Sequence, residues 1–262
     1  MKKRVFFPVL FGILIIGTIL GYNRWRAEQL LGPDAPESQD ISEWLEESVT
    51  PSPSEPPAEI DTTEEVETPS EDPLPTSLNI DMPFYTQAPF SNWDYPWQEA
   101  CEEASSALVA NLYLEKNWTR ESFNEELLRL VDYEMEAFGA YEHTSVEQTV
   151  QMIQDNYGLK TVVHENPSYE DLQKTLASGH LIIAPLAGKL LGNPNFTNGG
   201  PTYHMLVIKG YDSTQNQVVT HDVGTRNGAD YVYSWSVIQN ALHDWHEGDI
   251  TLGTPRWIEV YP

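Results

Sequence analysis

The chain is predicted to enter a helix at Trp97-Gln98-Glu99-Ala100-Cys101-Glu102-Glu103-Ala104-Ser105-Ser106-Ala107-Leu108, and this stretch carries the only cysteine of its 262 residues. We expect Cys101 to lie in the first turn of that helix, where unpaired N–H groups and the positive end of the helix dipole favour a thiolate over a thiol. A lone cysteine among alanines is more often a small buried hydrophobe on a helix face. Cys101 therefore indicates catalysis only if a base elsewhere in the chain reaches it.

Two predicted strands far downstream supply such a base and a carboxylate. Tyr203-His204-Met205-Leu206-Val207-Ile208 is typical of a buried strand, and Val218-Val219-Thr220-His221-Asp222 is typical of the next one. A cysteine, a histidine and an aspartate in this order are typical of thiol hydrolases, in which the histidine accepts the thiol proton and the carboxylate orients the ring. Taken singly, His204 also fits a structural sheet histidine, and Asp222 fits a turn residue. The prediction of catalysis therefore rests on Cys101, His204 and Asp222 together.

The rest of the domain shows predicted helices first and predicted strands afterwards. Helices are expected at residues 99–114, 120–131, 145–157 and 168–177, with Ser145 and Ser168 as N-caps and with Gly158 and Gly179 where helices end. Strands are expected at residues 181–187, 203–211, 217–221, 231–235 and 256–261. This order predicts an α+β domain, with N-terminal helices packed on a C-terminal antiparallel sheet. The loop of residues 188–201 leads into His204; a plain surface loop is the default interpretation, and a lid or substrate-binding edge is the alternative.

The first 26 residues have the layout of a membrane anchor or a signal peptide. Met1-Lys2-Lys3-Arg4 precedes an apolar run at residues 5–20, and further basic residues follow this run. Its length is close to the roughly 20 residues of a membrane span, and no small-x-small cleavage site follows, so an uncleaved anchor is favoured over a signal peptide. The basic N-terminus is expected to stay in the cytoplasm, with the remaining chain exported and anchored or, alternatively, secreted.

A change in composition divides the exported part of the chain. Residues 27–76 are rich in Pro, Glu, Ser, Asp and Thr and contain neither lysine nor arginine. Such a segment cannot bury enough apolar surface to offset the entropy of ordering it, which predicts a disordered, extended stalk. Residues 77–262 are long enough for one domain with its own core.

The charge and the cysteine count exclude several classes of function. The chain has 40 acidic residues against 14 lysines and arginines, a formal net charge of −26. We therefore expect no nucleic-acid partner, and we expect membrane contact only through the N-terminal helix. A single cysteine also excludes an intrachain disulfide.

Four segments carry a resemblance to a known family. They are Met82-Pro83-Phe84-Tyr85-Thr86-Gln87, the helix of Cys101, residues 172–183, and His204-Met205-Leu206-Val207-Ile208-Lys209-Gly210-Tyr211-Asp212. Together with Asp222, they resemble the papain-like cysteine peptidases. The similarity is greatest to the C39-like family, typified by the double-glycine leader peptidases that process bacteriocins, in its stand-alone exported branch. It spans residues 80–261 and implies a papain-like fold.

The resemblance also implies a division of labour among the site residues. Cys101 would attack the carbonyl carbon of a peptide or related amide bond, His204 would accept and return the proton, and Asp222 would orient His204. A glutamine amide and the backbone N–H of Cys101 would hold the oxyanion. Gln87 matches the family's glutamine by its strand context, whereas Gln98 lies nearer to Cys101 in the sequence, and Gln87 is preferred. The implied substrate is a peptide or protein, and no cofactor is implied.

One departure from the family supports a second interpretation. Many relatives have a glycine after the cysteine, whereas Glu102 and Glu103 follow Cys101 here. Carboxylates in the first turn stabilise a helix but oppose formation of a neighbouring thiolate, unless their side chains point away or Glu102 binds a substrate amine. The alternative function is a catalytically inactive papain-like module that binds peptides or cell-wall material.

A metal site is a further alternative, at His243-Asp244-Trp245-His246-Glu247. Histidines three residues apart share one face of a helix, and Asp249 would add an oxygen ligand. The same string is typical of a solvated helix end, so no metal is predicted.

Taken together, these features of the sequence predict an exported, membrane-anchored, papain-like thiol hydrolase.

Overall fold

The computed structural model describes residue 18, residues 21–41 and residues 73–262. The strands are β1 (Ser77–Asn79), β2 (Lys160–Glu165), β3 (Leu181–Leu186), β4 (His204–Asp212), β5 (Gln217–His221), β6 (Tyr231–Ser234) and β7 (Arg256–Tyr261). The helices are α3 (Cys101–Tyr113), α4 (Arg120–Ala137), α5 (Val146–Tyr157), α6 (Tyr169–Ala177) and α7 (Trp235–Ala241), with short 3-10 helices η1 (Trp97–Glu99), η2 (Gly188–Leu191), η3 (Thr197–Gly199) and η4 (Ile250–Leu252).

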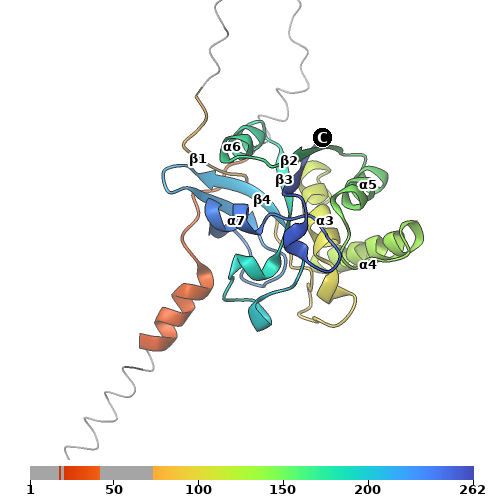
Figure 1. Ribbon diagram of the computed structural model, residues 1–262, viewed down its shortest axis with the longest axis horizontal. Helices are drawn as coiled ribbons and strands as arrows, with labels where there is room; N and C mark the ends of the chain where they lie inside the picture. The colour runs from red at the N-terminus through yellow and green to blue at the C-terminus, as the bar shows by residue number, and fades with distance from the viewer. Residues whose placement is uncertain (1–17, 19–20, 42–72) are drawn as a thin grey trace, which may run out of the picture.

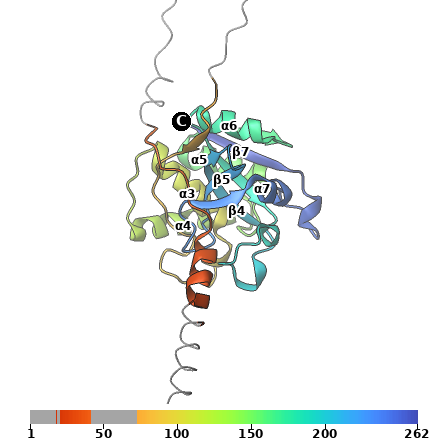
Figure 2. The ribbon, with the colours of Figure 1, turned by 90° about the vertical axis from the view of Figure 1, so that its left-hand side faces the viewer.

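The strands form one antiparallel sheet in the order β2-β7-β3-β4-β5-β6, with β1 paired to β4. Figure 2 shows α3, α4 and α5 on one side of the sheet and α7 on the other. Every residue from Cys101 to Asn111 of α3 is buried, because this helix packs against β4, α4 and α5. The predicted α+β class with an antiparallel sheet is confirmed.

Local signals set the ends of two helices where the sequence predicts them. The side chain of Ser145 caps α5 by accepting from the Gln148 N–H, and Ser168 caps α6 by accepting from the Asp171 N–H. Gly158 ends α5 in the left-handed conformation with φ 67°, which a residue without a Cβ adopts readily.

Other element boundaries differ from the sequence-based prediction. The helix expected from residue 99 begins at Cys101 because residues 97–99 form η1, and α4 continues to Ala137 rather than ending near residue 131. Strand β2 and helix α7 were not predicted. Strand β2 is a sheet edge and four of its six residues are exposed, so it lacks the apolar alternation that signals a strand.

Residues 30–41, here called the docked segment, pack on the domain although their composition placed them in an extended stalk. The N–H of Gln39 donates to the Asn79 carbonyl over 2.6 Å, and the N–H of Asp81 donates to the Gln39 carbonyl over 2.8 Å. Ile41 inserts into the core with only 2% of its surface exposed. The backbone hydrogen bonds and the burial of this apolar side chain offset the conformational entropy that the segment loses when it becomes ordered.

The N-terminal side of the docked segment continues into a helix. Residues 21–31 are helical, and Figure 1 shows this helix projecting from the domain. Within the described ranges, no helix is both long and apolar enough to cross a membrane. Most of the expected anchor, and residues 42–72 of the expected stalk, lie outside the described residues.

Candidate active site

Strand pairing brings His204 and Asp222 together. His204 begins β4 and Asp222 immediately follows β5, and these antiparallel neighbours pair with Val207 opposite His221. The start of β4 therefore lies beside the end of β5. Nε2 of His204 is 2.8 Å from Oδ1 of Asp222, so an Nε2–H donates to the carboxylate, and both side chains are buried.

Three further donors hold the Asp222 carboxylate in place. The Tyr233 hydroxyl donates to Oδ2 over 2.6 Å, Nδ2 of Asn193 donates to Oδ2 over 3.1 Å, and the Gly224 N–H donates to Oδ1 over 3.1 Å. Burial raises the pKa of Asp222, but its contacts with His204, Tyr233 and Gly224 outweigh burial and lower the pKa below its ordinary value. Asp222 is therefore a buried, ionised group with a fixed orientation.

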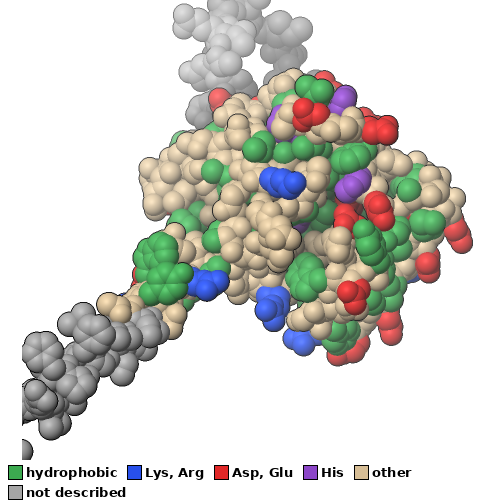
Figure 3. All heavy atoms as spheres, turned by 60° about the horizontal axis from the view of Figure 1, so that its bottom comes forward, with side chains coloured by type: hydrophobic (Ala, Val, Ile, Leu, Met, Phe, Trp, Pro, Cys, Tyr) green, Lys and Arg blue, Asp and Glu red, His purple; other side chains and the backbone are tan. Residues whose placement is uncertain are grey.

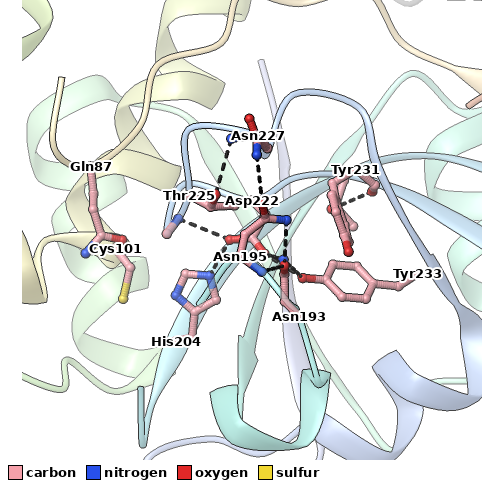
Figure 4. Close-up of polar contacts among 12 residues, drawn as sticks. Gln87, Cys101, Asn193, Asn195, His204, Asp222, Thr225, Asn227, Tyr231 and Tyr233 are labelled. Carbon is pink, nitrogen blue, oxygen red and sulfur yellow. Dashed lines mark hydrogen bonds and ion pairs between the residues drawn. The ribbon is translucent and has the colours of Figure 1, made fainter. Parts of the chain in front are cut away.

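The His204 ring is packed so that one nitrogen remains for Cys101. Phe196 meets it edge-on with 5.5 Å between ring centroids, and a Cβ added at Gly224 would lie 2.8 Å from its Cε1. Only glycine fits this close approach. Figure 4 shows Nε2 directed at Asp222 and the other ring nitrogen, Nδ1, on the side of Cys101.

Cys101 lies at the N-terminus of α3, as the sequence predicts. Helix α3 packs against β4, and the Met205 backbone near the start of that strand lowers the pKa of the thiol. Only 5% of Cys101 is exposed. Burial, followed by the charge and hydrogen bond of Glu102, raises the pKa of the thiol well above its ordinary value.

Glu102 does not point away from the sulfur. Its Oε2 lies 3.0 Å from Sγ of Cys101, and its Oε1 accepts from the Thr144 N–H over 3.1 Å. The side chain is buried, and burial raises its pKa to about 8 although the contact with Cys101 lowers it. Glu102 is therefore part of the surroundings of the sulfur and not a group free to receive a substrate amine.

Two more buried carboxyl groups stand behind Glu102, and the three together are called the carboxyl cluster. Glu103 and Glu134 are each 0% exposed, and Oε1 of Glu134 accepts from the Thr144 hydroxyl over 3.0 Å. Burial raises the pKa of Glu134 to about 7, and burial and then the neighbouring carboxylates raise the pKa of Glu103 well above its ordinary range. Since adjacent buried carboxylates repel, the cluster holds protons at neutral pH.

The two candidate oxyanion glutamines differ in their surroundings. Gln87 is buried, its N–H donates to the Val223 carbonyl, and its Nε2 donates to the carbonyls of Trp97 and Gln98 over 2.9 Å each. Figure 4 shows Gln87 on the Cys101 side of the site. Gln98 is exposed, and its Nε2 donates to Glu99. Gln87 thus lies in the site, with both amide hydrogens engaged by the backbone that precedes Cys101.

A pocket of about 280 Å³ adjoins Gln87. Its lining is mainly apolar and comprises Ala88, Pro89, Phe90, Asn92, Trp97 and Asn124. Two of the lining residues are tied to Gln87: Ala88 follows it in the chain, and the Trp97 carbonyl accepts a hydrogen bond from its Nε2. The pocket therefore opens beside the backbone that leads to Cys101.

The alternative metal site is not formed. Residues 243–246 are not helical, so the predicted shared helix face does not exist. Nδ1 of His243 lies 3.0 Å from the Gly253 carbonyl, and Oδ1 of Asp244 accepts from the N–H groups of Val146 and Trp245. In the part of the chain that the structure describes, no group of three His, Cys, Asp or Glu side chains is arranged to hold a metal ion.

Several residues around the site were missed by the sequence analysis. Asn193 belongs to the loop interpreted as a lid or rim, but it is buried and supports Asp222. Tyr233 occupies a predicted strand with no signal of its role. Glu134 and Thr144 both lie between the helices predicted at residues 120–131 and 145–157, and only the packing of α3 against α4 shows that they meet Glu102 and Glu103.

This chain is similar to a solved structure and to one protein family. A crystal structure from Bacillus anthracis, of a protein assigned as a C39-like peptidase, is similar with 17% identity and a TM-score of 0.47, covering 70% of this chain and 95% of that one. The comparison with curated proteins gave no match. A sequence profile described as the Peptidase_C39 like family matches residues 79–247, which contain Cys101, His204 and Asp222. The chain therefore belongs to the Peptidase_C39-like family.

Proposed function

We propose that this protein is an exported thiol hydrolase that cleaves peptide or related amide bonds with Cys101, His204 and Asp222. The observation that carries the proposal is the buried hydrogen bond of 2.8 Å between His204 and Asp222, which leaves Nδ1 of the same ring on the side of Cys101. Membership in a peptidase family supports the reaction class. Proton transfer from thiol to imidazole creates the nucleophile that such a reaction needs.

The reaction proceeds through an acyl-enzyme. Nδ1 of His204 takes the proton of the Cys101 thiol, and the thiolate attacks the substrate carbonyl carbon. The tetrahedral intermediate collapses to a thioester as the imidazolium gives its proton to the leaving amine. Water, deprotonated by the same imidazole, then attacks the thioester, and the thiol regains its proton as the acid is released. Asp222 stabilises the imidazolium that forms in each step.

The oxyanion is held by the N–H of Cys101 and by Gln87. The N–H of the first helical residue has no partner within the helix, so it is free to donate. Gln87 contributes once substrate displaces one of the two backbone carbonyls that its amide now contacts. Gln98 is the alternative donor, and its exposure argues against it.

The substrate is a peptide or protein. The pocket beside Gln87 suits an apolar side chain, since its lining includes Phe90 and Trp97. The acidic balance of the chain favours cationic segments in the rest of the substrate.

The proposed location is the outer face of a membrane, reached through an N-terminal anchor. Tyr22 and Trp25 are more than half exposed on the helix of residues 21–31, and such aromatic side chains favour membrane interfaces. Figure 3 shows acidic side chains gathered away from this helix and lysine and arginine side chains nearer to it. A secreted form is the alternative.

The deciding experiment is the pH dependence of Cys101 alkylation in the full chain, compared with His204→Ala. Since Cys101 is the only cysteine, every adduct reports on it. Fast labelling well below the free thiol pKa of roughly 8.5, lost in His204→Ala, is the expected result and justifies a screen of peptide substrates. Slow labelling that rises only near that pH in both proteins would refute the proposal.

The second candidate function is an inactive module that binds peptides or cell-wall material. The contact between Glu102 and Sγ favours it, because an ionised carboxylate 3.0 Å from the sulfur stabilises the thiol. A binding module predicts an unactivated cysteine together with retention of peptides or peptidoglycan fragments by a Cys101→Ala variant. Hydrolysis that disappears in Cys101→Ala excludes it.

A further inference from the structure

Glu102 touches the reacting atom of the proposed nucleophile. Its Oε1 is held by the backbone N–H of Thr144 over 3.1 Å, which leaves Oε2 directed at Sγ of Cys101 over 3.0 Å. Both side chains are buried. A sulfur and a carboxyl oxygen at this separation share a hydrogen bond, so a proton lies between them on one atom or the other.

The two positions of that proton have opposite consequences. If the carboxyl group is neutral, its O–H donates to a thiolate and stabilises it. If the carboxyl group is ionised, the S–H donates to the carboxylate, and the negative charge opposes thiolate formation. The protonation state of Glu102 therefore decides whether Cys101 can give its own proton to His204.

The surroundings favour the neutral carboxyl group. Titratable groups that face Glu102 come from several elements and are Glu99 of η1, Cys101 and Glu103 of α3, Glu134 of α4, and Tyr203 before β4. Each of these groups is neutral when protonated and negatively charged when deprotonated, so none of them supplies a positive charge. Across the described ranges, no lysine or arginine forms an ion pair with the carboxyl cluster. A buried carboxylate without a cation is costly, in agreement with a Glu102 pKa raised to about 8.

We propose that Glu102 is a catalytic residue that acts in its neutral form, its carboxyl O–H donating a hydrogen bond to the thiolate that forms when Nδ1 of His204 takes the Cys101 proton. Ionised Glu102 instead accepts a hydrogen bond from the thiol and keeps the proton on sulfur. This inference rests on the proposed function and adds a fourth side chain to it. The two acidic residues after the cysteine are then compatible with activity.

The proposal reverses the usual pH dependence of a cysteine. Alkylation of an ordinary thiol accelerates as the pH rises toward roughly 8.5. Here the labelling rate of Cys101 should fall as Glu102 ionises, and rise again only when the thiol itself deprotonates at higher pH.

The test compares iodoacetamide labelling rates of the full chain between about pH 5 and about pH 10. Glu102→Gln keeps an acceptor for Thr144 and an N–H donor for the sulfur but cannot ionise. We expect it to lose the fall in rate and to label about tenfold faster than the unaltered chain near pH 9, since one pKa unit corresponds to tenfold. Glu99→Gln is the matched control, because it removes a nearby carboxylate that does not touch the sulfur, and its profile should retain the fall.

The outcomes separate this inference from the proposed function. If Glu102→Gln and the unaltered chain share one profile while His204→Ala loses labelling at low pH, the Glu102 step is wrong and the thiol hydrolase stands. If His204→Ala changes nothing, the thiol hydrolase and the Glu102 step both fail.

A measurement on the unaltered chain guards against a variant that does not fold. The infrared C=O band of a protonated carboxyl group should be present at neutral pH and should shift when Cys101 is alkylated. A carboxyl band that ignores alkylation would overturn the assignment of Glu102.

Discussion

The Tyr233 hydroxyl donates a hydrogen bond of 2.6 Å to Oδ2 of Asp222, while His204 occupies Oδ1 of the same carboxylate. Tyr233 comes from β6 and His204 from β4, on either side of β5, at whose end Asp222 lies. The orientation of the proposed base is therefore fixed across three adjacent strands.

Replacing this hydroxyl should weaken the fold and loosen the base. Tyr233→Phe removes one donor to a buried charge, and we expect a loss of about 2 kcal/mol in the free energy of unfolding, measured by urea denaturation. The low-pH labelling of Cys101 should slow in parallel. Tyr231→Phe is the control, since it removes a hydroxyl on the same strand without a hydrogen bond to Asp222. Equal stability of the two variants would show that the contact contributes nothing.

The two glutamines should differ in their effect on turnover. Gln87→Ala should lower kcat by about 10²–10³, the loss seen when one oxyanion donor is removed, whereas Gln98→Ala should leave kcat unchanged. Steady-state kinetics on any peptide found in the substrate screen provide the measurement. A larger loss in Gln98→Ala would transfer the oxyanion role to that residue.

Glu259 should make the stability of the sheet depend on acid. Its carboxylate contacts Nε2 of His164 and Nδ1 of His180 over 2.5 Å each, and these hydrogen bonds lower its pKa to about 2. A carboxyl pKa that is lower in the folded chain than in the unfolded one gives stability that is fully present above the unfolded value of roughly 4.3 and is lost as the pH falls toward the folded value.

Unfolding by urea at about pH 6 and about pH 3 tests this contribution. Glu259→Gln should lose less stability between these conditions than the unaltered chain does. Glu170→Gln is the matched control, because it removes a carboxylate that pairs with Lys174 on the helix surface. Identical losses in all three proteins would contradict the prediction.

The docked segment should stabilise the domain through Ile41. Truncating this buried side chain in Ile41→Ala should cost about 3 kcal/mol, in the range for isoleucine in a core. Leu252→Ala, at a side chain that is 67% exposed, should change stability by less than about 0.5 kcal/mol. Hydrogen exchange of the Asp81 N–H, which donates to Gln39, should accelerate only in the first variant.

Sequence reasoning succeeded where the signal is local. The serines that cap α5 and α6 were predicted because each is followed three residues later by a side chain that completes the cap. The strand of His204 was predicted because nearly all of β4 is apolar and buried. Its place beside Asp222 follows from the pairing of consecutive strands.

Sequence reasoning failed where the outcome depends on residues far apart in the chain. Glutamates in a first helical turn are normally solvated, and the burial of Glu102 and Glu103 follows only from the packing of α4 and Thr144 around them. Likewise, Ile41 stands among polar residues, and the residues that pair with its neighbour Gln39 lie beyond a long acidic segment. Composition averages over such a segment and cannot identify one side chain that reaches a core.

The docked segment also changes what a cut in the connecting residues would do. Residues 42–72 supply the only covalent link between Ile41 and the residues that lead into β1. After cleavage there, the N-terminal fragment would still be held by the backbone pair of Gln39, by Ile41 in the core, and by the Leu30 carbonyl, which accepts from Nδ2 of Asn195. Shedding of the domain from its proposed anchor would then be a dissociation equilibrium between two fragments rather than a single irreversible event.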